Sequence, residues 1–490
     1  MVETALARLR LAAAIALGTP LSVRSLERMV AAARAAVDEF GLVRAGTAEL
    51  VGAAAMDQKT RRSIAERGFR KQAVRATKET QYYAALFDQI GCDPAELRFD
   101  DIAEVPVTSK EALREQPDAF VCRDAQPFLC AMTTGTTGNP ARVSYSRREL
   151  DTFSCMAALH ALVGGQIRPD DIVGISISLR AALAVTIAAG TCARVGATAY
   201  FTGQIEPAAT LQLLSKTHRL PRKTSRTSVL LCYTSYLGEL IEHGQALGYS
   251  HRDFGLRSIR VAGEIVTEGL LERARALFGP VEFVQGYATN ELDPLSGSAC
   301  SEGHLHFQPW AGLVEVQSLE GNGAARPGEP GTIVATPFSP YRVTTPLLRY
   351  DTQDVVRALP DGLSCSLGHL PAISKPLGRL PLSVQHDGGW TFQRDILEAV
   401  EGLDAVPLPT RFGFWRVPGG VAVELYTRSV ERGVKDAVAT ALEEHGVPLR
   451  ELELVDDPRR LRKPLPVRAD LREISFELAE QHPAVVMAPA

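Results

Sequence analysis

The residues most able to do chemistry form a threonine- and glycine-rich segment after the apolar stretch Pro127–Met132. It reads Thr133-Thr134-Gly135-Thr136-Thr137-Gly138-Asn139-Pro140. Glycine lets the backbone approach a ligand closely and adopt conformations that are closed to other residues. Exposed backbone N–H groups and threonine hydroxyls together make a cradle for an anion such as a polyphosphate. No Gly-Lys-Ser/Thr ends the segment, so it is not a Walker loop. Alone, it predicts a phosphate site, with a surface turn as the alternative.

Five further motifs follow in a set order. They are Val261-Ala262-Gly263-Glu264, Gly286-Tyr287-Ala288-Thr289-Asn290-Glu291, Pro346-Leu347-Leu348-Arg349-Tyr350-Asp351-Thr352-Gln353-Asp354, Leu377-Gly378-Arg379 and Arg462-Lys463. With the threonine-rich segment they resemble, in this order, the motifs of the adenylate-forming superfamily of acyl-CoA synthetases, adenylation domains and luciferases. Gln81-Tyr82-Tyr83, Asp100-Asp101-Ile102 and the run from Val105 to Glu111 are similar to the phenylacetate-CoA ligase-like branch. The resemblance covers roughly residues 60 to 470.

The resemblance implies a role for each matching residue. Thr133–Gly138, with Thr137 among the catalytic residues, would hold the ATP phosphates and shield charge in the transition state. Tyr287 would stack on adenine, and Gly263 and Glu264 would line its edge. Asn290 stands where threonine or serine is usual, and its amide can still donate to a phosphate oxygen.

The remaining matches imply metal, ribose and acid contacts. Glu291 would help to hold Mg²⁺, a hard cation that prefers oxygen ligands. Asp354 would accept hydrogen bonds from the ribose hydroxyls. Arg379 would contact nucleotide or phosphate near a hinge. Lys463 would neutralise charge between the acid and the α-phosphate, although a basic run like Arg459–Lys463 is also typical of a solvated surface.

Other positions depart from the family pattern. Ala288 replaces a glycine after the tyrosine, and Gln353 replaces the glycine before Asp354. After Arg379 the sequence is Leu380-Pro381-Leu382, where the family shows acidic residues, and proline stiffens the chain there. In the family, the small domain rotates about this hinge between adenylation and thioester formation. A stiffer hinge therefore puts the thioester-forming half-reaction in doubt.

Some relatives carry a zinc cluster, and candidate ligands occur here at the corresponding positions. They are Cys300, His304, His306 and Cys365, whereas Leu367 occupies one expected cysteine position. Tetrahedral structural zinc needs four ligands. The alternative is a set of ordinary buried cysteines and histidines.

Apolar β-type runs that alternate with helical patterns must position these motifs. The runs are Ile172–Leu179, Ala197–Gly203, Ser228–Ser235, Ser258–Gly263, Val281–Tyr287 and Thr332–Phe338. Such alternation predicts an α/β fold with largely buried sheets flanked by helices. Downstream, Arg411–Val417, Val421–Thr427, Glu431–Glu444 and Glu451–Val455 predict two strands, a helix and a strand, and a last helix follows Asp456–Arg468. We therefore expect a helical extension at 1–58, a large ATP- and acid-binding domain at 59–376 and a small mobile α+β domain at 377–490.

Composition bounds the class of protein. Of 490 residues, 53 are Lys or Arg and 57 are Asp or Glu, which gives a net charge of −4. A general nucleic-acid binder would normally carry a basic excess. The apolar stretch Leu11–Gly18 is too short to span a bilayer, and we expect a packed helix rather than a signal peptide. Eight scattered cysteines indicate free thiols in a reducing cytoplasm.

Three functions are compatible with these features. The first is adenylation of a small carboxylic acid, aromatic by analogy with the branch, followed by transfer to coenzyme A. The second keeps ATP, Mg²⁺ and adenylation but changes the acceptor to an amine, a carrier protein, or an arylamine that is diazotised by activated nitrite. The third is an inactive nucleotide-binding homologue. The expected partners are the acid, ATP and the acceptor, with a homodimer left open and neither nucleic acid nor membrane involved.

Overall fold

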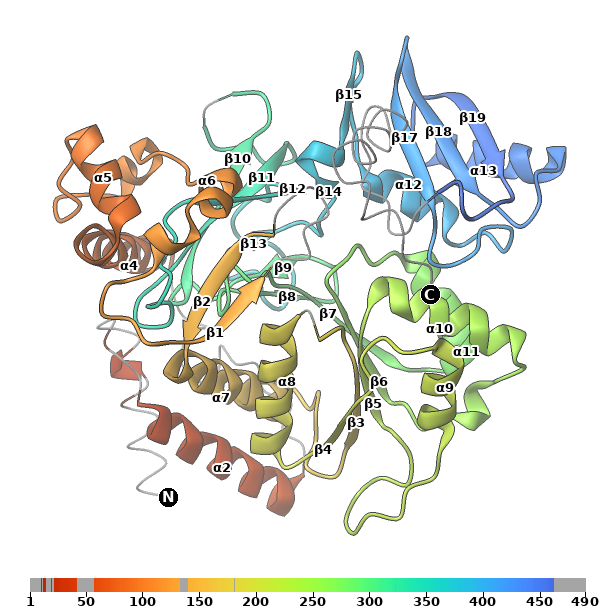
Figure 1. Ribbon diagram of the computed structural model, residues 1–490, viewed down its shortest axis with the longest axis horizontal. Coiled ribbons are helices and arrows are strands. Elements are labelled where there is room, and N and C mark those ends of the chain that lie inside the picture. The colour runs from red at the N-terminus through yellow and green to blue at the C-terminus, as the bar shows by residue number, and fades with distance from the viewer. Residues whose placement is uncertain are drawn as a thin grey trace.

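An eight-stranded sheet in the order β13-β9-β8-β7-β6-β5-β3-β4 forms the centre of the protein (Figure 1). The computed structural model describes residues 10, 12–14, 19, 22–41, 57–132, 140–179, 181–321 and 323–461. Strands β3 to β7 are parallel, and β8, β9 and β13 continue the sheet antiparallel. The bounds are β3 Ile172–Ser176, β4 Thr198–Phe201, β5 Val229–Tyr233, β6 Ser258–Ala262, β7 Glu282–Tyr287, β8 Gly297–Ala299, β9 Leu305–His306 and β13 Ala372–Ile373.

Helices cover both faces of the parallel strands (Figure 1). One face packs against α7 (Arg147–Val163) and α8 (Ala182–Val195). The other packs against α10 (Thr234–Ala246) and α11 (Glu268–Phe278), with α9 (Pro207–Ser215) beside α10. Burial on both faces explains why these strands are continuous apolar runs in the sequence.

Side chains alternate between the two faces along β6, which matters for the site. Ile259 and Val261 join the core under α10 and α11. Arg260 therefore faces the α7–α8 side, where Val229 and Leu231 of β5 pack.

The first turn of α7 is tied to a distant segment by Glu149. Ser146 and Glu149 form a capping box, in which each side chain accepts a hydrogen bond from the other's backbone N–H. Glu149 Oε1 also accepts from the backbone N–H groups of Val343 at 2.8 Å and Thr344 at 3.1 Å. Buried Glu149 thereby fixes the helix that backs the sheet against the chain leading to Asp354.

Antiparallel sheets complete the large part of the protein. Strands β1 (Pro127–Met132) and β2 (Arg142–Ser146) pair antiparallel, and the threonine-rich segment stands between them in the sequence. A four-stranded sheet has the order β10-β11-β12-β14. Its bounds, with those of the helices near it, are β10 Gly312–Ser318, β11 Pro330–Pro337, β12 Tyr350–Arg357, β14 Gly378–Arg379, α4 Gln58–Glu79, α5 Gln81–Ile90, η2 Phe99–Glu104, α6 Lys110–Glu115 and η3 Pro117–Phe120.

The C-terminal part has a hydrophobic core of its own, drawn from residues between Leu382 and Leu454. Its three-stranded sheet has the order β17-β18-β19, and Figure 1 shows it above α10 and α11. The elements are η5 Leu380–Leu382, β15 Val384–His386, β16 Gly389–Thr391, α12 Gln393–Val400, β17 Phe412–Val417, β18 Gly420–Tyr426, α13 Arg432–Glu444 and β19 Leu449–Val455.

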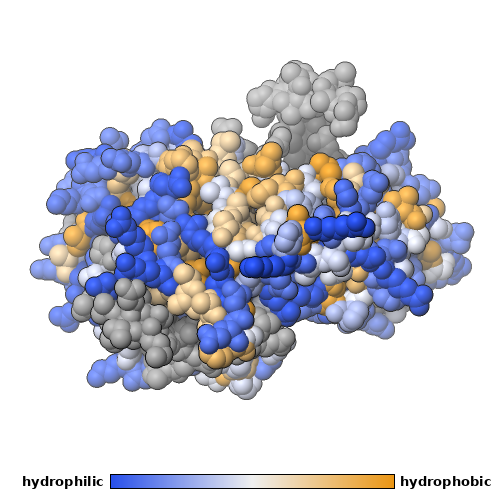
Figure 2. Space-filling model, turned by 90° about the horizontal axis from the view of Figure 1, so that it is seen from below, coloured by the Kyte–Doolittle hydropathy of each residue, from blue (hydrophilic) through white to orange (hydrophobic). Residues whose placement is uncertain are grey.

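Near the N-terminus, α2 (Val23–Phe40) packs against α7 and α8. Its buried residues Leu26, Met29 and Val30 join the core on that side of the sheet. Of the helix expected at Leu11–Gly18, residues 12–14 are helical and Ala14 is buried in the same core, and the rest of that stretch lies outside the described residues. No described helix is long and apolar enough to cross a membrane. The face in Figure 2 is hydrophilic at both ends, with most of its apolar residues toward the middle.

The structure confirms the α/β class and places a strand within each of the six predicted apolar runs. In the C-terminal part, both predicted strands of the hairpin, the helix and the next strand are also present, with ends shifted by a few residues. The last helix predicted after Asp456–Arg468 lies outside the described residues. The stretch from Leu370 to Leu382 is irregular, but it contributes β13 and β14 to two different sheets.

Polar contacts join the C-terminal part to α10 and α11. Thr267, the N-cap of α11, accepts a hydrogen bond from Leu270 N at 3.1 Å and donates its hydroxyl to buried Glu401. Arg273 Nη1 donates to the carbonyl of Val406 at 2.8 Å. These contacts hold the C-terminal part over one helical face of the sheet.

We expect this contact to weaken as pH rises, because burial raises the pKa of Glu401 from 4.5 to about 7. Between these values the folded chain keeps a proton that an exposed Glu401 releases, so stability falls with rising pH. The effect is on the order of 3 kcal/mol. Glu401→Gln stays neutral and should give a flatter curve of melting temperature between pH 5 and 8. Glu398→Gln on the same helix is the control, and parallel curves for wild type and Glu401→Gln would contradict the prediction.

Candidate active site

A cavity of about 890 Å³ opens at the carboxyl ends of the parallel strands, beneath the C-terminal part. Ligands of open α/β sheets usually bind at this edge of the sheet. The structure brings seven of the sequence-predicted site residues to this one cavity: Gly263, Glu264, Tyr287, Asn290, Glu291, Asp354 and Arg379. Thr133–Gly138, which include Thr137, and Lys463 lie outside the described residues.

Asp354 lies at the centre of a hydrogen-bonded group on the cavity wall. Its Oδ2 accepts from the Tyr287 hydroxyl at 2.8 Å, and its Oδ1 faces Arg379 Nε at 3.3 Å. Burial, followed by the charge of Asp354, raises the pKa of Tyr287 well above its usual value. Tyr287 therefore stays a neutral donor at every physiological pH. The carboxylate of Asp354 is held in place by residues of β7 and β14.

Gly263 closes β6 in a conformation that favours glycine. Its φ is +89°, and a Cβ at this position would lie 2.5 Å from the ring of Tyr233. The close approach places the Tyr233 ring on the cavity wall beside the strand end. Tyr233 lies within a predicted strand, but the sequence did not mark it as a site residue.

Glu264 plays a more structural part than the motif alone suggested. Its Oε2 accepts from the backbone N–H of Ser235 in the first turn of α10. Burial raises its pKa, and the Ser235 hydrogen bond acts in the opposite direction. Glu264 still lines the cavity, but its carboxylate caps a helix.

Asn290 connects the motif after β7 to the end of β1. Its Nδ2 donates to the carbonyl of Met132 at 2.9 Å, and its own carbonyl accepts from the Tyr145 hydroxyl. Met132 directly precedes Thr133. The amide that replaces the usual hydroxyl therefore reaches the point where the threonine-rich segment begins.

Glu291 is almost fully buried and has two polar partners on the cavity side. Lys110 Nζ lies 3.5 Å from its Oε1, and the Tyr350 hydroxyl donates to the same oxygen at 3.0 Å. Lys110 also lines the cavity. The sequence singled out the segment of Lys110 only as a branch feature, so its pairing with Glu291 is a finding of the structure. Two residues after Glu291, burial raises the pKa of Asp293 to about 7.

Gln353 shows why a glycine is expected before Asp354. Its φ is +63°, in the left-handed region that costs a non-glycine residue roughly 1 kcal/mol or more. Its side-chain amide donates to Glu111 of α6 at 3.3 Å. The long side chain is therefore tied to α6.

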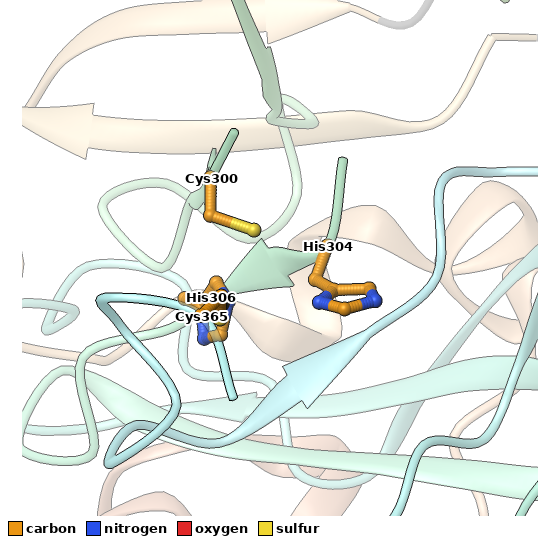
Figure 3. A group of neighbouring side chains, drawn as sticks. All are labelled: Cys300, His304, His306 and Cys365. Atoms are coloured by element: carbon orange, nitrogen blue, oxygen red, sulfur yellow. Dashed lines mark hydrogen bonds between the residues drawn. The ribbon is translucent and has the colours of Figure 1, made fainter. Parts of the chain in front are cut away.

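A second cluster lies at the antiparallel edge of the main sheet (Figure 3). Ligand atoms of Cys300, His304, His306 and Cys365 all lie within 4.8 Å of one another. Cys300 and His304 flank the turn between β8 and β9, His306 ends β9, and Cys365 comes from the segment between β12 and β13. Cys365 Sγ is 3.3 Å from His306 Nε2, and His304 Nδ1 is buried without a hydrogen-bond partner among the described residues.

This geometry fits a tetrahedral zinc ion. Two sulfurs and two imidazole nitrogens make a full set of four ligands, so no protein position stays open for a substrate. All eight cysteines, these two included, are free thiols. Leu367, which occupies a family cysteine position, offers no metal ligand, and the cluster consists of Cys300, His304, His306 and Cys365.

Comparison with known proteins identifies relatives of this fold. No family model matches the chain. A phenylacetate-coenzyme A ligase of Thermus thermophilus is 23% identical over 321 residues, 63% of this chain and 68% of that protein. One of Aromatoleum evansii is 22% identical over 58% of this chain and 63% of its own length. The crystal structure of 2-hydroxyisobutyryl-CoA ligase with an acyl adenylate superposes with a TM-score of 0.69 at 19% identity, covering 87% of this chain and 93% of that one. The chain therefore has the fold of adenylate-forming enzymes.

Proposed function

We propose that this chain, which belongs to the adenylate-forming superfamily, joins a small carboxylic acid to the α-phosphate of ATP and passes the acyl group to coenzyme A. The observation that carries the proposal is the convergence of Gly263, Tyr287, Glu291 and Asp354 on one cavity. The matched 2-hydroxyisobutyryl-CoA ligase has been seen with its acyl adenylate and with CoA.

The nucleoside would occupy the part of the cavity beside Gly263 and Asp354. Asp354 has its two oxygens oriented by Tyr287 and Arg379, so it can accept hydrogen bonds from the ribose hydroxyls without losing its orientation. Tyr287 and Tyr233 supply aromatic surface for adenine. The backbone at Gly263 allows the base to approach closely.

Glu291 is the described residue best suited to hold Mg²⁺, which supplies charge neutralisation at the phosphates when bound. Lys110 lies beside it and adds a positive charge on the same wall. By resemblance, Thr133–Gly138 would hold the phosphates, and Thr137 and Lys463 would act on the reacting oxygens. Asn290 supports this location, because it anchors the chain at Met132.

We further propose that residues 377–490 form the small domain that rotates between the two half-reactions. The C-terminal part contacts α10 and α11 through both hydrogen bonds and apolar atoms. Such a mixed contact fits a domain that docks on these helices and separates from them. The backbones of Gly269 in α11 and Gly402 are in close contact, because a Cβ on Gly269 would lie 2.4 Å from the Gly402 nitrogen.

Pyrophosphate exchange with a panel of acids, with and without coenzyme A, tests the function. We expect an acid to stimulate exchange, and AMP and an acyl-CoA to form together when CoA is added. AMP formation without a CoA product would instead support another acceptor, such as an amine, a carrier protein or activated nitrite. If neither an acid nor nitrite stimulates exchange, the chain is not an adenylating enzyme.

We also propose that Cys300, His304, His306 and Cys365 bind one structural zinc ion. The proposal is supported by four ligand atoms within 4.8 Å of one another and by the buried Nδ1 of His304, which has no hydrogen-bond partner among the described residues. When bound, zinc supplies a crosslink and no reactive group. It would join the β8–β9 turn to the segment that leads through β13 to Arg379.

A further inference from the structure

Arg260 is a half-buried cation among apolar residues of the sheet. It lies at the middle of β6, beside Leu231 of β5 and Val284 of β7, and it faces the α7–α8 side of the sheet. The residue is half-buried, and it lines the large cavity. Burying an unpaired charge is costly, and buried arginines normally meet a carboxylate.

The described residues supply Arg260 with a neutral partner only. Nη1 donates to Gln166 Oε1 at 2.5 Å, and no carboxylate of the described chain forms an ion pair with it. The fully buried Arg342 also lacks an ion pair among the described residues, but its guanidinium stacks on the Tyr145 ring and does not line the cavity. The other described cations that line the cavity each have a carboxylate partner, and they are Lys110, Arg114, Lys375, Arg379 and Arg394.

Neighbouring groups do not neutralise the charge either. Gln166 Nε2 lies 3.4 Å from His160 Nε2, so the amide oxygen is committed to Arg260 and the amide nitrogen to the imidazole. Burial, reinforced by the Arg260 charge, lowers the pKa of His160 to about 4. His160 is therefore neutral at physiological pH. Glu282, at the start of β7, acts on Arg260 only from beyond ion-pair distance.

The cavity that Arg260 lines has apolar as well as polar surface. Ile177, Ala181, Ala184 and Leu231 supply apolar surface, and Ser178, Gln204 and Gln285 are polar. Gly263 is three positions after Arg260 along the chain, which is roughly 10 Å at strand spacing. A carbon skeleton would fit along this wall, with its reacting carboxylate at the nucleotide end and the guanidinium at the other.

We propose that Arg260 binds a second anionic group on the acid, so that the preferred substrate is a dicarboxylic acid. The inference rests on the proposed function, because it assigns the acyl end of the same cavity. A guanidinium presents paired N–H donors that match a carboxylate in two parallel hydrogen bonds. The second carboxylate would form the ion pair that Arg260 lacks among the described residues.

Pyrophosphate exchange with matched acids tests this proposal. The pairs are glutarate with pentanoate, adipate with hexanoate, and isophthalate with benzoate. We expect kcat/KM to be about 100-fold higher for the best diacid than for its monoacid. The reason is that the monoacid lacks the second carboxylate, so Arg260 stays without a charged partner when it binds. Arg260→Leu should remove that advantage and leave or improve the monoacids, and Arg260→Lys should retain part of it. Arg226→Leu, which removes a cation outside the cavity, is the control.

Two results would overturn the proposal while leaving the proposed function intact. One is a wild-type enzyme that uses monoacids as well as their matched diacids, a result that needs no folded variant. The other is an unchanged diacid preference in Arg260→Leu. If no acid supports exchange, the proposed function fails, and calorimetric binding of the six acids to wild type and Arg260→Leu then decides the subsite. Diacid binding that depends on Arg260 supports it, and its absence refutes it.

Discussion

Replacing Glu291 with glutamine should lower Mg²⁺-dependent pyrophosphate exchange by about 100-fold or more, the scale for losing a preorganised charge at the reacting centre. Glutamine keeps the size of the side chain but removes the charge that attracts both the metal ion and Lys110. The Tyr350 hydroxyl can still donate to the amide oxygen, so the fold around β12 should remain. A titration of exchange against Mg²⁺ should show a higher metal requirement as well as a lower maximum.

Stability should change together with activity, because Lys110 loses its partner. Lys110 and Glu291 expose only 9% and 4% of their side chains. Removing one member of a buried ion pair typically costs 3–5 kcal/mol, whereas replacing both with apolar residues costs much less. Lys110→Met with Glu291→Leu should therefore be more stable than Glu291→Leu alone while remaining inactive. Denaturant unfolding of the wild type, Glu291→Leu and the double variant measures the difference in free energy of unfolding.

Glu315→Gln provides a matched control. Glu315 pairs with the largely buried Arg349 at 3.0 Å, but it does not line the cavity. This variant should lose stability in the same way and keep the Mg²⁺ requirement of the wild type. Equal metal responses in Glu291→Gln and Glu315→Gln would contradict a metal-binding role for Glu291.

The strands of the main sheet could be predicted because helices cover them on both faces. A strand buried on both sides needs an apolar residue at nearly every position, so β3, β5 and β6 are visible as continuous runs. The motifs at Gly263 and Tyr287 were identified by resemblance, and the apolar runs placed them at the ends of strands. Their convergence is then a consequence of parallel strands that end at one edge.

The partners of the site residues could not be predicted, because they come from distant segments. Lys110 precedes Glu291 by 181 positions, and the two meet only because α6 packs against β12. Arg260 looks like an interruption in an apolar strand until the neighbouring side chains are seen. Glu264 matches its motif, yet its carboxylate caps α10, and no pattern in the sequence marks that use.

Gln353 illustrates a different limit. The sequence showed that a glycine was missing, and the positive φ of this residue shows what that glycine would have supplied. The position is held by the backbone around it, where Gln353 N donates to Asp351 Oδ1 at 2.8 Å and Asp354 N donates to Thr352 Oγ1 at 3.1 Å. Local hydrogen bonds can thus impose a conformation that the residue type disfavours.

The purified protein should contain about one zinc ion per chain, and Cys365→Ser should remove it. Cys365 is the only ligand of the four that is not in the β8–β9 region, so its loss cuts the crosslink between two segments 59 residues apart. Structural zinc stabilises a fold by a large fraction of its binding free energy. We therefore expect the melting temperature to fall by several degrees or more, and chelation of the wild type should have a similar effect.

Cys122→Ser separates loss of zinc from loss of a buried thiol. Cys122 is also a buried free cysteine, but it lies near α5 and η3, away from the cluster. This variant should keep its zinc and respond to chelator as the wild type does. Because the cluster lies at the edge of the sheet and the segment after it carries Arg379, zinc loss should also raise the KM for ATP more than it lowers kcat. Metal analysis that finds no zinc in the wild type would refute the site, and zinc retained by Cys365→Ser would refute this ligand set.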